Sequence, residues 1–462
     1  MQIMKKLLIW ILTIESRLII GKYKPFIVAI TGSVGKTSTK DAIYCVLKNR
    51  ERYARKSEKS MNSEIGLPLT IIGAPNAWHS FSGWLRNIML GAKMIINRVD
   101  YPNCLILEIG ADHPGDIRKV ARWLHPDIVV ITRISKTPVH VEFFKSSEEV
   151  FKEKAFLARV VKDGGTLILF ADDDKVMTLG EIPKVLNATK NMKDKKIEVL
   201  TFGIDMPATA RGENYMGSIQ SGISFTLDLA DEKVPVSTHG VLGKVYLYSL
   251  LAAAVVGKVR NIPLADIVKS LNGYEAPRGR MNIIPGINGS MLIDDTYNSS
   301  PDAVMSALET LKELKSEVTS NAIKEDFGLV NLSNIPIGQV SHRKIAVLGD
   351  MMELGRFSTD EHRKIGREAA GIVNILITVG PRAQMIAEEA LRSGIPADYV
   401  KCFDSSSDAA PYVASIAGAG DIILVKGSQS PRLERVTKAL LREPEKADKL
   451  LVRQEEEWLN KK

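Results

Sequence analysis

Residues 26–47 bring together the residue types that proteins use to hold a chain of phosphate groups. An apolar run at 26–30 has the pattern of a buried strand, and residues 39–47 have the pattern of a helix. The loop between them contains, in order, Thr31, Gly32, Ser33, Val34, Gly35, Lys36, Thr37 and Ser38. In such a loop, glycines let backbone N–H groups close around phosphates, and the following helix N-terminus adds partial positive charge. The pattern predicts a site for a nucleotide triphosphate.

Two side chains of this loop have the chemistry that a triphosphate with Mg²⁺ requires. The ammonium group of Lys36 can reach the β- and γ-phosphates, and the hydroxyl of Thr37 can bind Mg²⁺. The common spacing of the motif places another glycine where this chain has Ile30, so the loop is a shorter variant. The alternative is an ordinary strand-to-helix turn in which Lys36 is solvated.

The composition is that of a globular protein with several domains. The chain has 462 residues, of which 45% are hydrophobic and 25% charged, and its formal net charge is +8. This charge suits anionic substrates, but no aromatic and basic module of the RNA-binding kind occurs, so we expect no nucleic-acid partner. Cys45, Cys104 and Cys402 lie far apart without metal-ligand spacing, which is typical of a reducing compartment. We therefore expect a cytoplasmic protein.

Residues 1–25 contain a short apolar run at 7–14 that follows two lysines. A secretory signal is disfavoured because Glu15 and Arg17 come next, without a small-residue cleavage site. The run is also too short to span a bilayer. We predict an amphipathic N-terminal helix that lies on the protein, with a weak contact to a membrane surface as the alternative.

Residues 26–275 alternate between apolar runs and helical patterns, which predicts an α/β domain with a mostly parallel sheet. We expect strands at 26–30, 104–108, 127–132, 166–170 and 198–202, helices at 39–47, 147–161 and 245–259, and β-hairpins at 212–240. Glu108 stands at the carboxyl end of its strand, where open α/β sheets bind ligands.

Residues 276–462 repeat the α/β rhythm after a linker-like stretch at 275–280 that contains Pro, Gly and Arg. We expect strands at 291–293, 344–348, 375–379, 399–403 and 421–425, and helices at 302–314, 360–370, 383–393 and 432–441. The long irregular segment 316–341 predicts a surface insertion. The chain is thus expected to be α/β throughout, with a mostly parallel, doubly wound sheet in this second region.

Short motifs in both regions occur in an order that resembles one enzyme family. After the phosphate loop come 62–66 (Asn-Ser-Glu-Ile-Gly), 107–111 (Leu-Glu-Ile-Gly-Ala), 140–142 (His-Val-Glu), 153–154 (Glu-Lys), 279–281 (Gly-Arg-Met), 294–298 (Asp-Asp-Thr-Tyr-Asn), 348–355 (Leu-Gly-Asp-Met-Met-Glu-Leu-Gly) and 426–428 (Lys-Gly-Ser). From about residue 26 to the C-terminus, the set resembles the Mur ligase family of ATP-dependent amide ligases. Within that family it is most similar to members that add D-alanyl-D-alanine to a UDP-sugar-linked tripeptide in peptidoglycan precursor synthesis.

The resemblance implies that residues 26–275 form a central P-loop ATPase domain and residues 276–462 a C-terminal Rossmann-like domain. It also implies a mechanism and a metal set. ATP would phosphorylate a substrate carboxylate, and an amine would then displace phosphate from the acyl phosphate. Transfer between two anions needs cations, which Lys36, Arg280 and two Mg²⁺ ions would supply. By the resemblance, Thr37 and Glu108 hold one Mg²⁺, His140 assists the second, and Lys154 matches a lysine that relatives carry as a metal-binding carbamate.

The resemblance also implies contacts to the nucleotide and to both substrates. Asp295 matches the acidic residue near the ribose, and Asn298 lies in the same motif. The candidates for binding the incoming amine are Asp350, Glu353 and Lys426, and those for positioning the peptide end of the acceptor are Asn62 and Glu64.

Each of these residues also has a plainer interpretation when it is considered alone. Glu108 could cap a helix or form an ion pair, and His140 could be structural. Lys154 could be a solvated lysine on a charged helix face, and the Asp-Asp-x-x-Asn segment could be a turn.

Three features depart from the family pattern. Only about 25 residues precede the phosphate-loop strand, so the usual UDP-sugar-binding N-terminal domain is expected to be lacking. Val245 and Ser249 stand where the family has His and Asn, so the adenine contacts must differ, and the connection from Thr132 to His140 is longer than expected. The alternatives are a ligase with another acceptor, resembling folylpolyglutamate or cyanophycin synthases, and a non-catalytic nucleotide-binding relative.

Overall fold

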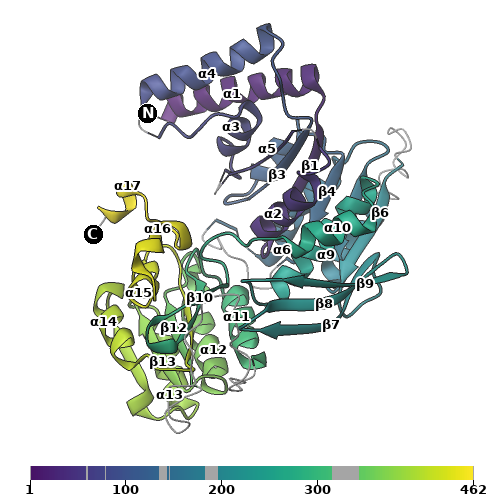
Figure 1. Cartoon of the computed structure of the whole chain (residues 1–462). Coiled ribbons are helices and arrows are strands. Elements are labelled where there is room, and N and C mark those ends of the chain that lie inside the picture. Colours follow the sequence, from purple (N-terminus) through teal and green to yellow (C-terminus); the bar gives the residue numbers. More distant parts are fainter. Residues whose placement is uncertain are drawn as a thin grey trace. The chain divides into compact units, whose positions relative to one another are not determined.

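The computed structural model describes residues 2–51, 53–58, 61–78, 80–134, 143–144, 146–182, 196–314 and 343–460. The chain divides into two compact units (Figure 1). The first comprises Met1–Asn214, Phe225–Val236 and Val245–Tyr274, and the second comprises Tyr215–Ser224, Ser237–Lys244 and Glu275–Lys462. The ends of three hairpin strands therefore group with the second unit, whereas the sequence predicted a contiguous domain at 26–275. The boundaries predicted at 25/26 and 275/276 stay predictions.

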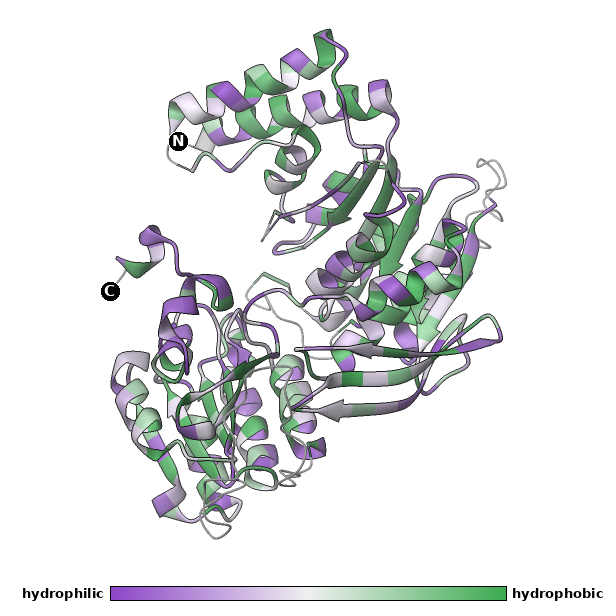
Figure 2. Cartoon of the chain, viewed as in Figure 1, coloured by the Kyte–Doolittle hydropathy of each residue, from purple (hydrophilic) through white to green (hydrophobic). Residues whose placement is uncertain are grey.

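The first sheet is mostly parallel, and its central strands are hydrophobic (Figure 2). Its nine strands lie in the order β2 (Ala54–Lys56), β3 (Cys104–Glu108), β1 (Phe26–Thr31), β4 (Ile128–Ile131), β5 (Thr166–Phe170), β6 (Glu198–Gly203), β7 (Ala210–Ser218), β8 (Gly222–Leu229) and β9 (Glu232–Thr238). Each pairing from β2 to β7 is parallel. Ile30 is paired with Glu108, and Thr31 with Ile131, so three carboxyl ends meet at the phosphate loop.

Local sequence signals place the helices around this sheet edge. Helix α2 (Lys36–Leu47) packs against β1, β2 and β3, and α6 (Ser147–Ala158) packs against β4. The side chain of Ser146 caps α6 by accepting a hydrogen bond from Glu149 N at 3.3 Å. The other helices are α3 (Gly66–Ile72), α5 (Asp116–Ala121), α7 (Asp174–Met177), α9 (Lys244–Val259) and α10 (Leu264–Asn272).

The N-terminal helix α1 (Gln2–Tyr23) lies on the protein, where it packs against α3 and α4 (Phe81–Ile96). Leu12 and Ile19 are its fully buried apolar residues. Lys22 Nζ donates to the carbonyl oxygens of Met94, Ile95 and Asn97 at 3.0, 2.9 and 2.7 Å, which satisfies the C-terminus of α4. Within the described residues, no helix is both long and apolar enough to cross a membrane.

The second unit holds a six-stranded sheet with its own core. The order is β10 (Asn282–Pro285), β11 (Met291–Asp295), β15 (Ile422–Lys426), β12 (Lys344–Gly349), β13 (Ile375–Val379) and β14 (Val400–Phe403). The pairing of β10 with β11 is antiparallel and the others are parallel. The helices are α11 (Pro301–Glu313), α12 (Ser358–Ala370), α13 (Gln384–Arg392), α14 (Ser406–Ile416), α15 (Glu434–Ala439), α16 (Ala447–Leu450) and α17 (Glu456–Leu459). Aliphatic residues of the inner strands, such as Val347, Ile377 and Val425, form its core.

The predicted α/β fold class is confirmed, with parallel strands in both sheets. Most of the elements that were not predicted are short or follow polar loops. They are helices α3, α4, α5, α7, α10, α14, α16 and α17 and strands β2 and β10. The insertion predicted at 316–341 lies outside the described residues.

Glu15 is a buried carboxyl group in the contact between α1 and α4. A Cβ atom at Gly91 of α4 would lie 2.3 Å from Glu15 Oε2, so the carboxyl group packs where α4 has no side chain. In the described part of the chain, this oxygen has no hydrogen-bond partner. Burial raises the pKa of Glu15 to about 7, because water no longer stabilises its charged form.

We expect Glu15→Gln to stabilise the protein at alkaline pH. The pKa of Glu15 is about 7 in the folded state and 4.5 in the unfolded state. As pH rises from about 4.5 to about 7, the unfolded state loses the Glu15 proton before the folded state does. The free energy of unfolding of the wild type therefore falls over this range by up to about 3 kcal/mol. The melting temperature of Glu15→Gln should exceed that of the wild type at pH 8 and approach it at pH 5. The exposed Glu232→Gln is the matched control. Equal shifts at both pH values would contradict this assignment.

Candidate active site

The phosphate loop is shaped by close contacts that only glycine permits. Gly32 has a φ of +149°, and a Cβ atom added to it would lie 1.9 Å from Thr132 Oγ1. That hydroxyl donates a hydrogen bond to Val34 O at 2.8 Å, which holds the loop against the residue that follows β4. Gly35, with a φ of +84°, is the left-handed residue that immediately precedes α2. The loop therefore leads directly into the N-terminus of α2, where the partial positive charge of the helix favours the binding of anions.

Backbone amides of the loop contact the segment that follows β4. Ser33 N donates to Arg133 O at 2.8 Å, and Val34 N lies 3.4 Å from the same oxygen. A phosphate that used these two N–H groups would have to exchange places with the Arg133 carbonyl. Sequence reasoning found Arg133 only as part of an unusually long connection, because a backbone carbonyl leaves no signal in residue type.

Two lysine side chains converge on the carbonyl side of the loop. Lys36 Nζ donates to Ser33 O at 3.3 Å, and the buried Lys154 Nζ, from α6, donates to Gly32 O at 2.9 Å. Burial, together with the nearby charge of Lys36, lowers the pKa of Lys154 to about 7. The structure thus places Lys36 and Lys154 on the same loop, and the burial of Lys154 excludes its interpretation as a solvated lysine. The metal-binding role of Lys154 stays a prediction.

Glu108 is buried at the end of β3 beside a lysine that sequence reasoning missed. Lys40, on α2, is 2% exposed, and its Nζ lies 3.7 Å from Glu108 Oε2. Asn62 Nδ2 donates to Glu108 Oε1 at 3.3 Å. Lys40 stands four residues after Lys36 and so shares its side of the helix, which is the signal that could have identified it.

The donor set near the loop fits one Mg²⁺ ion in part. Glu108 Oε2 is buried and accepts no hydrogen bond from the described residues, so a hard oxygen ligand is available. Thr37 begins the same helix as Lys36. Among the described residues, no three His, Cys, Asp or Glu side chains form a metal-binding group. His140, the predicted partner of a second ion, lies outside the described residues.

Glu153 and Glu64 tie the surrounding segments together. The two carboxylate oxygens of Glu153 accept from Gly115 N at 2.9 Å and Arg118 N at 3.0 Å, so Glu153 caps α5 and fixes α6 beside it. Glu64 forms an ion pair with Lys119 of α5. Of the two residues predicted to position an acceptor, Asn62 therefore contacts Glu108, and Glu64 contacts α5 instead.

Val245 and Ser249, which replace the His and Asn of the family, lie beside the loop. A Cβ atom at Gly35 would contact Val245 Cγ1 at 3.6 Å and Ser249 Oγ at 3.8 Å. Thr39 Oγ1 donates to Ser249 Oγ at 3.2 Å. These two side chains pack helix α9 against the start of α2.

The second unit brings three of its predicted residues together at the end of β15. Lys426 Nζ is 2.6 Å from Asp295 Oδ2 and 3.1 Å from Asn298 O, and it is 2% exposed. Burial of this ion pair makes it sensitive to loss of either partner. The sequence had assigned Asp295 to the ribose and Lys426 to the amine, and both assignments stay predictions.

The segment that contains Asp350 and Glu353 is held by a buried histidine. Asp350 Oδ1 accepts from Ala383 N at 2.8 Å, and Met351 N donates to His362 Nε2 at 3.0 Å. Since His362 Nδ1 lies 2.6 Å from Ser358 O, that nitrogen carries the proton. Burial lowers the pKa of His362, which keeps the ring neutral and the segment fixed.

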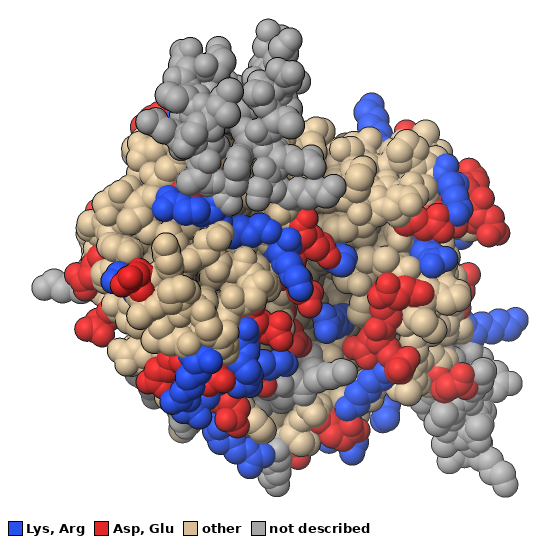
Figure 3. Space-filling view, turned by 90° about the horizontal axis from the view of Figure 1, so that it is seen from below, with Lys and Arg blue, Asp and Glu red and all other residues tan. Residues whose placement is uncertain are grey.

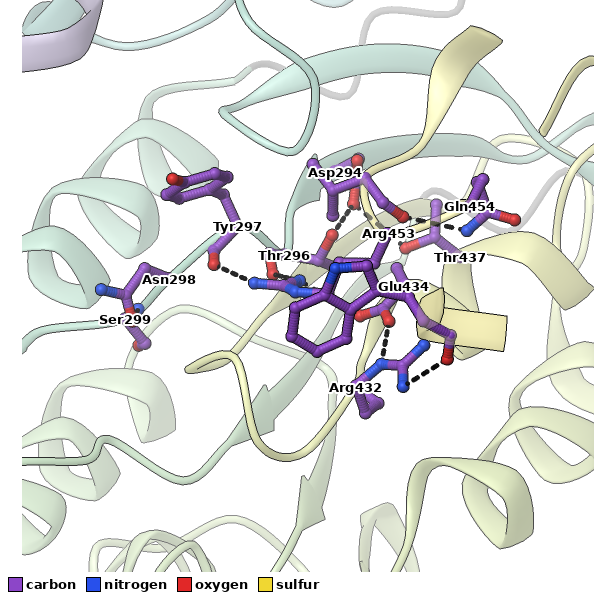
Figure 4. A network of polar contacts seen from close by, with 12 residues as sticks. Asp294, Thr296, Tyr297, Asn298, Ser299, Arg432, Glu434, Thr437, Arg453 and Gln454 are labelled. Carbon is purple, nitrogen blue, oxygen red and sulfur yellow. Dashed lines mark hydrogen bonds and ion pairs between the residues drawn. The ribbon is translucent and has the colours of Figure 1, made fainter. Parts of the chain in front are cut away.

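A network of buried charges surrounds the end of β11 (Figure 4). Thr296 and Thr437 donate to Asp294 Oδ1 at 2.8 and 3.2 Å, while burial raises the pKa of Asp294 to about 7. Glu434 pairs with Arg432 and Arg453. Arg453 also donates to the carbonyl oxygens of two strand-end residues, Thr296 and Tyr297. The network anchors the C-terminal segment of the second unit.

Arg280 lies next to this network, with its guanidinium 4.2 Å from the ring centre of Tyr297. It belongs to the second unit, and its predicted contact with phosphates stays a prediction. Figure 3 shows one face of the molecule on which basic and acidic side chains are interspersed, so the net charge of +8 is not gathered there.

Comparisons with known proteins assign these features to a family. A family model described as the Mur ligase middle domain matches residues 87–257, and one described as the Mur ligase glutamate ligase domain matches residues 331–429. These matches cover more than half of the chain.

Curated relatives match across both domains. The UDP-N-acetylmuramoyl-tripeptide–D-alanyl-D-alanine ligase of Bacillus subtilis (strain 168) is 26% identical over 419 residues, which are 90% of this chain and 76% of that protein. The ligase of the same name from Mycobacterium tuberculosis (strain ATCC 25618 / H37Rv) is 28% identical over 431 residues, 90% of this chain and 72% of that one.

A solved structure agrees on the fold. The MurF ligase from Thermotoga maritima in complex with ADP has a TM-score of 0.71 at 22% identity, covering 96% of this chain and 84% of that one. Together with the phosphate loop, these matches show that the chain belongs to the Mur ligase family of ATP-dependent amide ligases.

Proposed function

We propose that this chain joins D-alanyl-D-alanine to the free carboxylate of a UDP-N-acetylmuramoyl-tripeptide, converting ATP to ADP and phosphate. The names of its relatives supply the substrates. The observation that carries the chemistry is a glycine loop at the N-terminus of α2 with Lys36 beside it, and with buried Glu108 at the end of the neighbouring strand. Such a site binds a polyanion.

Positive charge is what the first chemical step requires. A carboxylate oxygen of the acceptor attacks the γ-phosphorus while the bond to the β-phosphate oxygen breaks, so two anions must approach each other. Lys36 and the N–H groups at the start of α2 neutralise that charge where it develops. The product of the step is an acyl phosphate and ADP.

The second step needs an amine close to the acyl carbon. The neutral amine of the dipeptide attacks this carbon, phosphate leaves with the former carboxylate oxygen, and the nitrogen loses a proton to give the amide. Asn62, which donates a hydrogen bond to Glu108 Oε1 at 3.3 Å, would orient the acceptor carboxylate. Glu64 would act on the acceptor only by exchanging its contact with Lys119.

Mg²⁺, when bound, would neutralise phosphate charge and align the phosphates for in-line transfer. Glu108 and Thr37 would hold it, with a second ion depending on His140. Lys154 would contribute as a carbamate, because its buried amine, with a pKa of about 7, is largely neutral just above neutral pH and can add CO₂.

A panel of amines tests the proposed substrate. With ATP, Mg²⁺ and UDP-N-acetylmuramoyl-tripeptide, phosphate release should depend on D-alanyl-D-alanine and should be much slower with D-alanine, L-glutamate or L-aspartate. Turnover with a folate or a polypeptide acceptor and an amino acid, without the muramoyl peptide, would favour an alternative ligase. Phosphate release that no amine stimulates would support a non-catalytic relative.

Lys36→Ala should lower the kcat of ligation by about 100-fold or more, because the transition state loses the ammonium group that neutralises charge on the phosphates. The exposed Lys48→Ala at the other end of α2 is the matched control and should behave like the wild type. A Lys36→Ala enzyme within twofold of the wild type would show that the loop does not hold the reacting phosphates.

Lys154 should carry a carbamate when bicarbonate is present. In ¹³C NMR with ¹³C-bicarbonate, the wild type should show a protein-bound carbamate signal that grows as pH rises through about 7, the pKa at which the amine becomes neutral. Lys154→Ala should lack this signal, while Lys152→Ala, which alters an exposed lysine of the same helix, should retain it. A signal that survives in Lys154→Ala would refute the modification.

A further inference from the structure

Helix α1 exposes a stripe of apolar side chains. Ile3, Leu7, Trp10 and Leu18 follow one side of the helix at spacings of four, three and eight residues. Ile3 is 84% and Trp10 62% exposed, and the other two are also exposed. Isolated exposed apolar residues are ordinary, but a continuous stripe on one helix marks an interaction surface.

Helix α4 exposes a second apolar stripe. Phe81, Leu85, Met89 and Ile96 are spaced by four, four and seven residues, and Phe81 and Ile96 are 76% and 79% exposed. Trp78, which precedes the helix, is exposed as well. Helix α4 packs beside α1, so the two apolar stripes belong to neighbouring helices (Figures 1 and 2).

The opposite sides of both helices are already in use. Leu12 and Ile19 of α1 are fully buried, as are Asn87 and Gly91 of α4. Asn87 Nδ2 donates to Pro75 O at 2.8 Å. The exposed stripes therefore cannot turn inward without breaking the packing that holds the two helices on the first unit.

Charges on these helices are almost entirely positive. Residues 2–24 contain a single acidic residue, the buried Glu15, and residues 76–99 contain none. The exposed basic residues of the two segments are Lys5, Lys6, Arg17, Lys22, Lys24, Arg86, Lys93 and Arg98. Apolar stripes flanked by cations of one sign complement a surface that is negatively charged outside and apolar beneath.

An anionic lipid bilayer has that combination of properties. A protein partner would meet a surface rich in lysine, which is depleted from the centre of protein interfaces. Tryptophan, present at Trp10 and Trp78, favours the level of the lipid headgroups. Helix α1 has 22 residues and is about 33 Å long, so it can lie along a membrane surface.

We propose that α1 and α4 dock the protein onto an anionic bilayer surface, with their apolar stripes in the headgroup region and the surrounding lysines and arginines on lipid phosphates. This inference does not depend on the identity of the ligase substrates. It extends the membrane contact considered for residues 1–25 to a second helix that the sequence did not predict.

Vesicle flotation of the full chain tests the proposal. The protein should float with vesicles of phosphatidylcholine and phosphatidylglycerol and remain unbound with phosphatidylcholine alone, and binding should fall as salt is raised. No flotation with anionic vesicles at low salt would overturn the proposal. Sedimentation showing a stable dimer, together with no vesicle binding, would assign the stripes to a second copy instead.

Substitutions on each helix separate the two stripes. Trp10→Glu on α1 and Met89→Glu on α4 should each weaken vesicle binding by about tenfold or more. Leu391→Glu, which alters an exposed apolar residue of α13, is the matched control and should bind like the wild type. Unchanged binding in both stripe variants would overturn the proposal.

Conservative variants guard against misfolding. Lys6→Gln and Arg86→Gln should each reduce vesicle affinity by about fivefold, while ligase turnover in solution stays at the wild-type level. Quenching of tryptophan fluorescence by lipids with brominated tails should diminish in Trp10→Phe. Full quenching in that variant, together with charge variants that bind normally, would contradict docking through these helices.

Discussion

The concentration of positive charge at the phosphate loop is the constraint on which the first unit depends. Burying an ammonium group is unfavourable unless an anion, a hydrogen-bond acceptor or loss of the proton compensates for it. Lys40 is compensated by Glu108 at 3.7 Å, and Lys154 by Gly32 O and by a lowered pKa. The parallel register of β1, β3 and β4 brings these groups to one sheet edge. A bound triphosphate would complete this balance of charge.

The buried charges of the second unit are also paired within the unit. Lys426 pairs with Asp295, and Glu434 pairs with Arg432 and Arg453. Breaking such pairs is more damaging than never having buried them. Internal pairing gives Asp295 and Lys426 a structural role that exists before any substrate binds, and a substrate contact there would have to work with that pair.

Features could be predicted from the sequence where a residue type, in its local pattern, has one common structural role. The glycine loop, Lys36 and the strand that ends in Glu108 could be found because glycine conformation and apolar periodicity leave direct traces. Thr132 could not, since its role arises from contact with Gly32 across the fold. For Lys40 the only signal in the sequence is its spacing of four residues from Lys36, because its pairing with Glu108 depends on the fold. Helix α4 was missed although its stripe is regular, because it follows a polar loop and lies apart from the family motifs.

The most direct test is a crystal structure with Mg²⁺ and a non-hydrolysable ATP analogue. The account predicts that the triphosphate lies against residues 32–37 with Lys36 Nζ on its oxygens, and that Ser33 N leaves the Arg133 carbonyl to bind phosphate. A nucleotide bound elsewhere, with the 2.8 Å hydrogen bond from Ser33 N to Arg133 O intact, would contradict it.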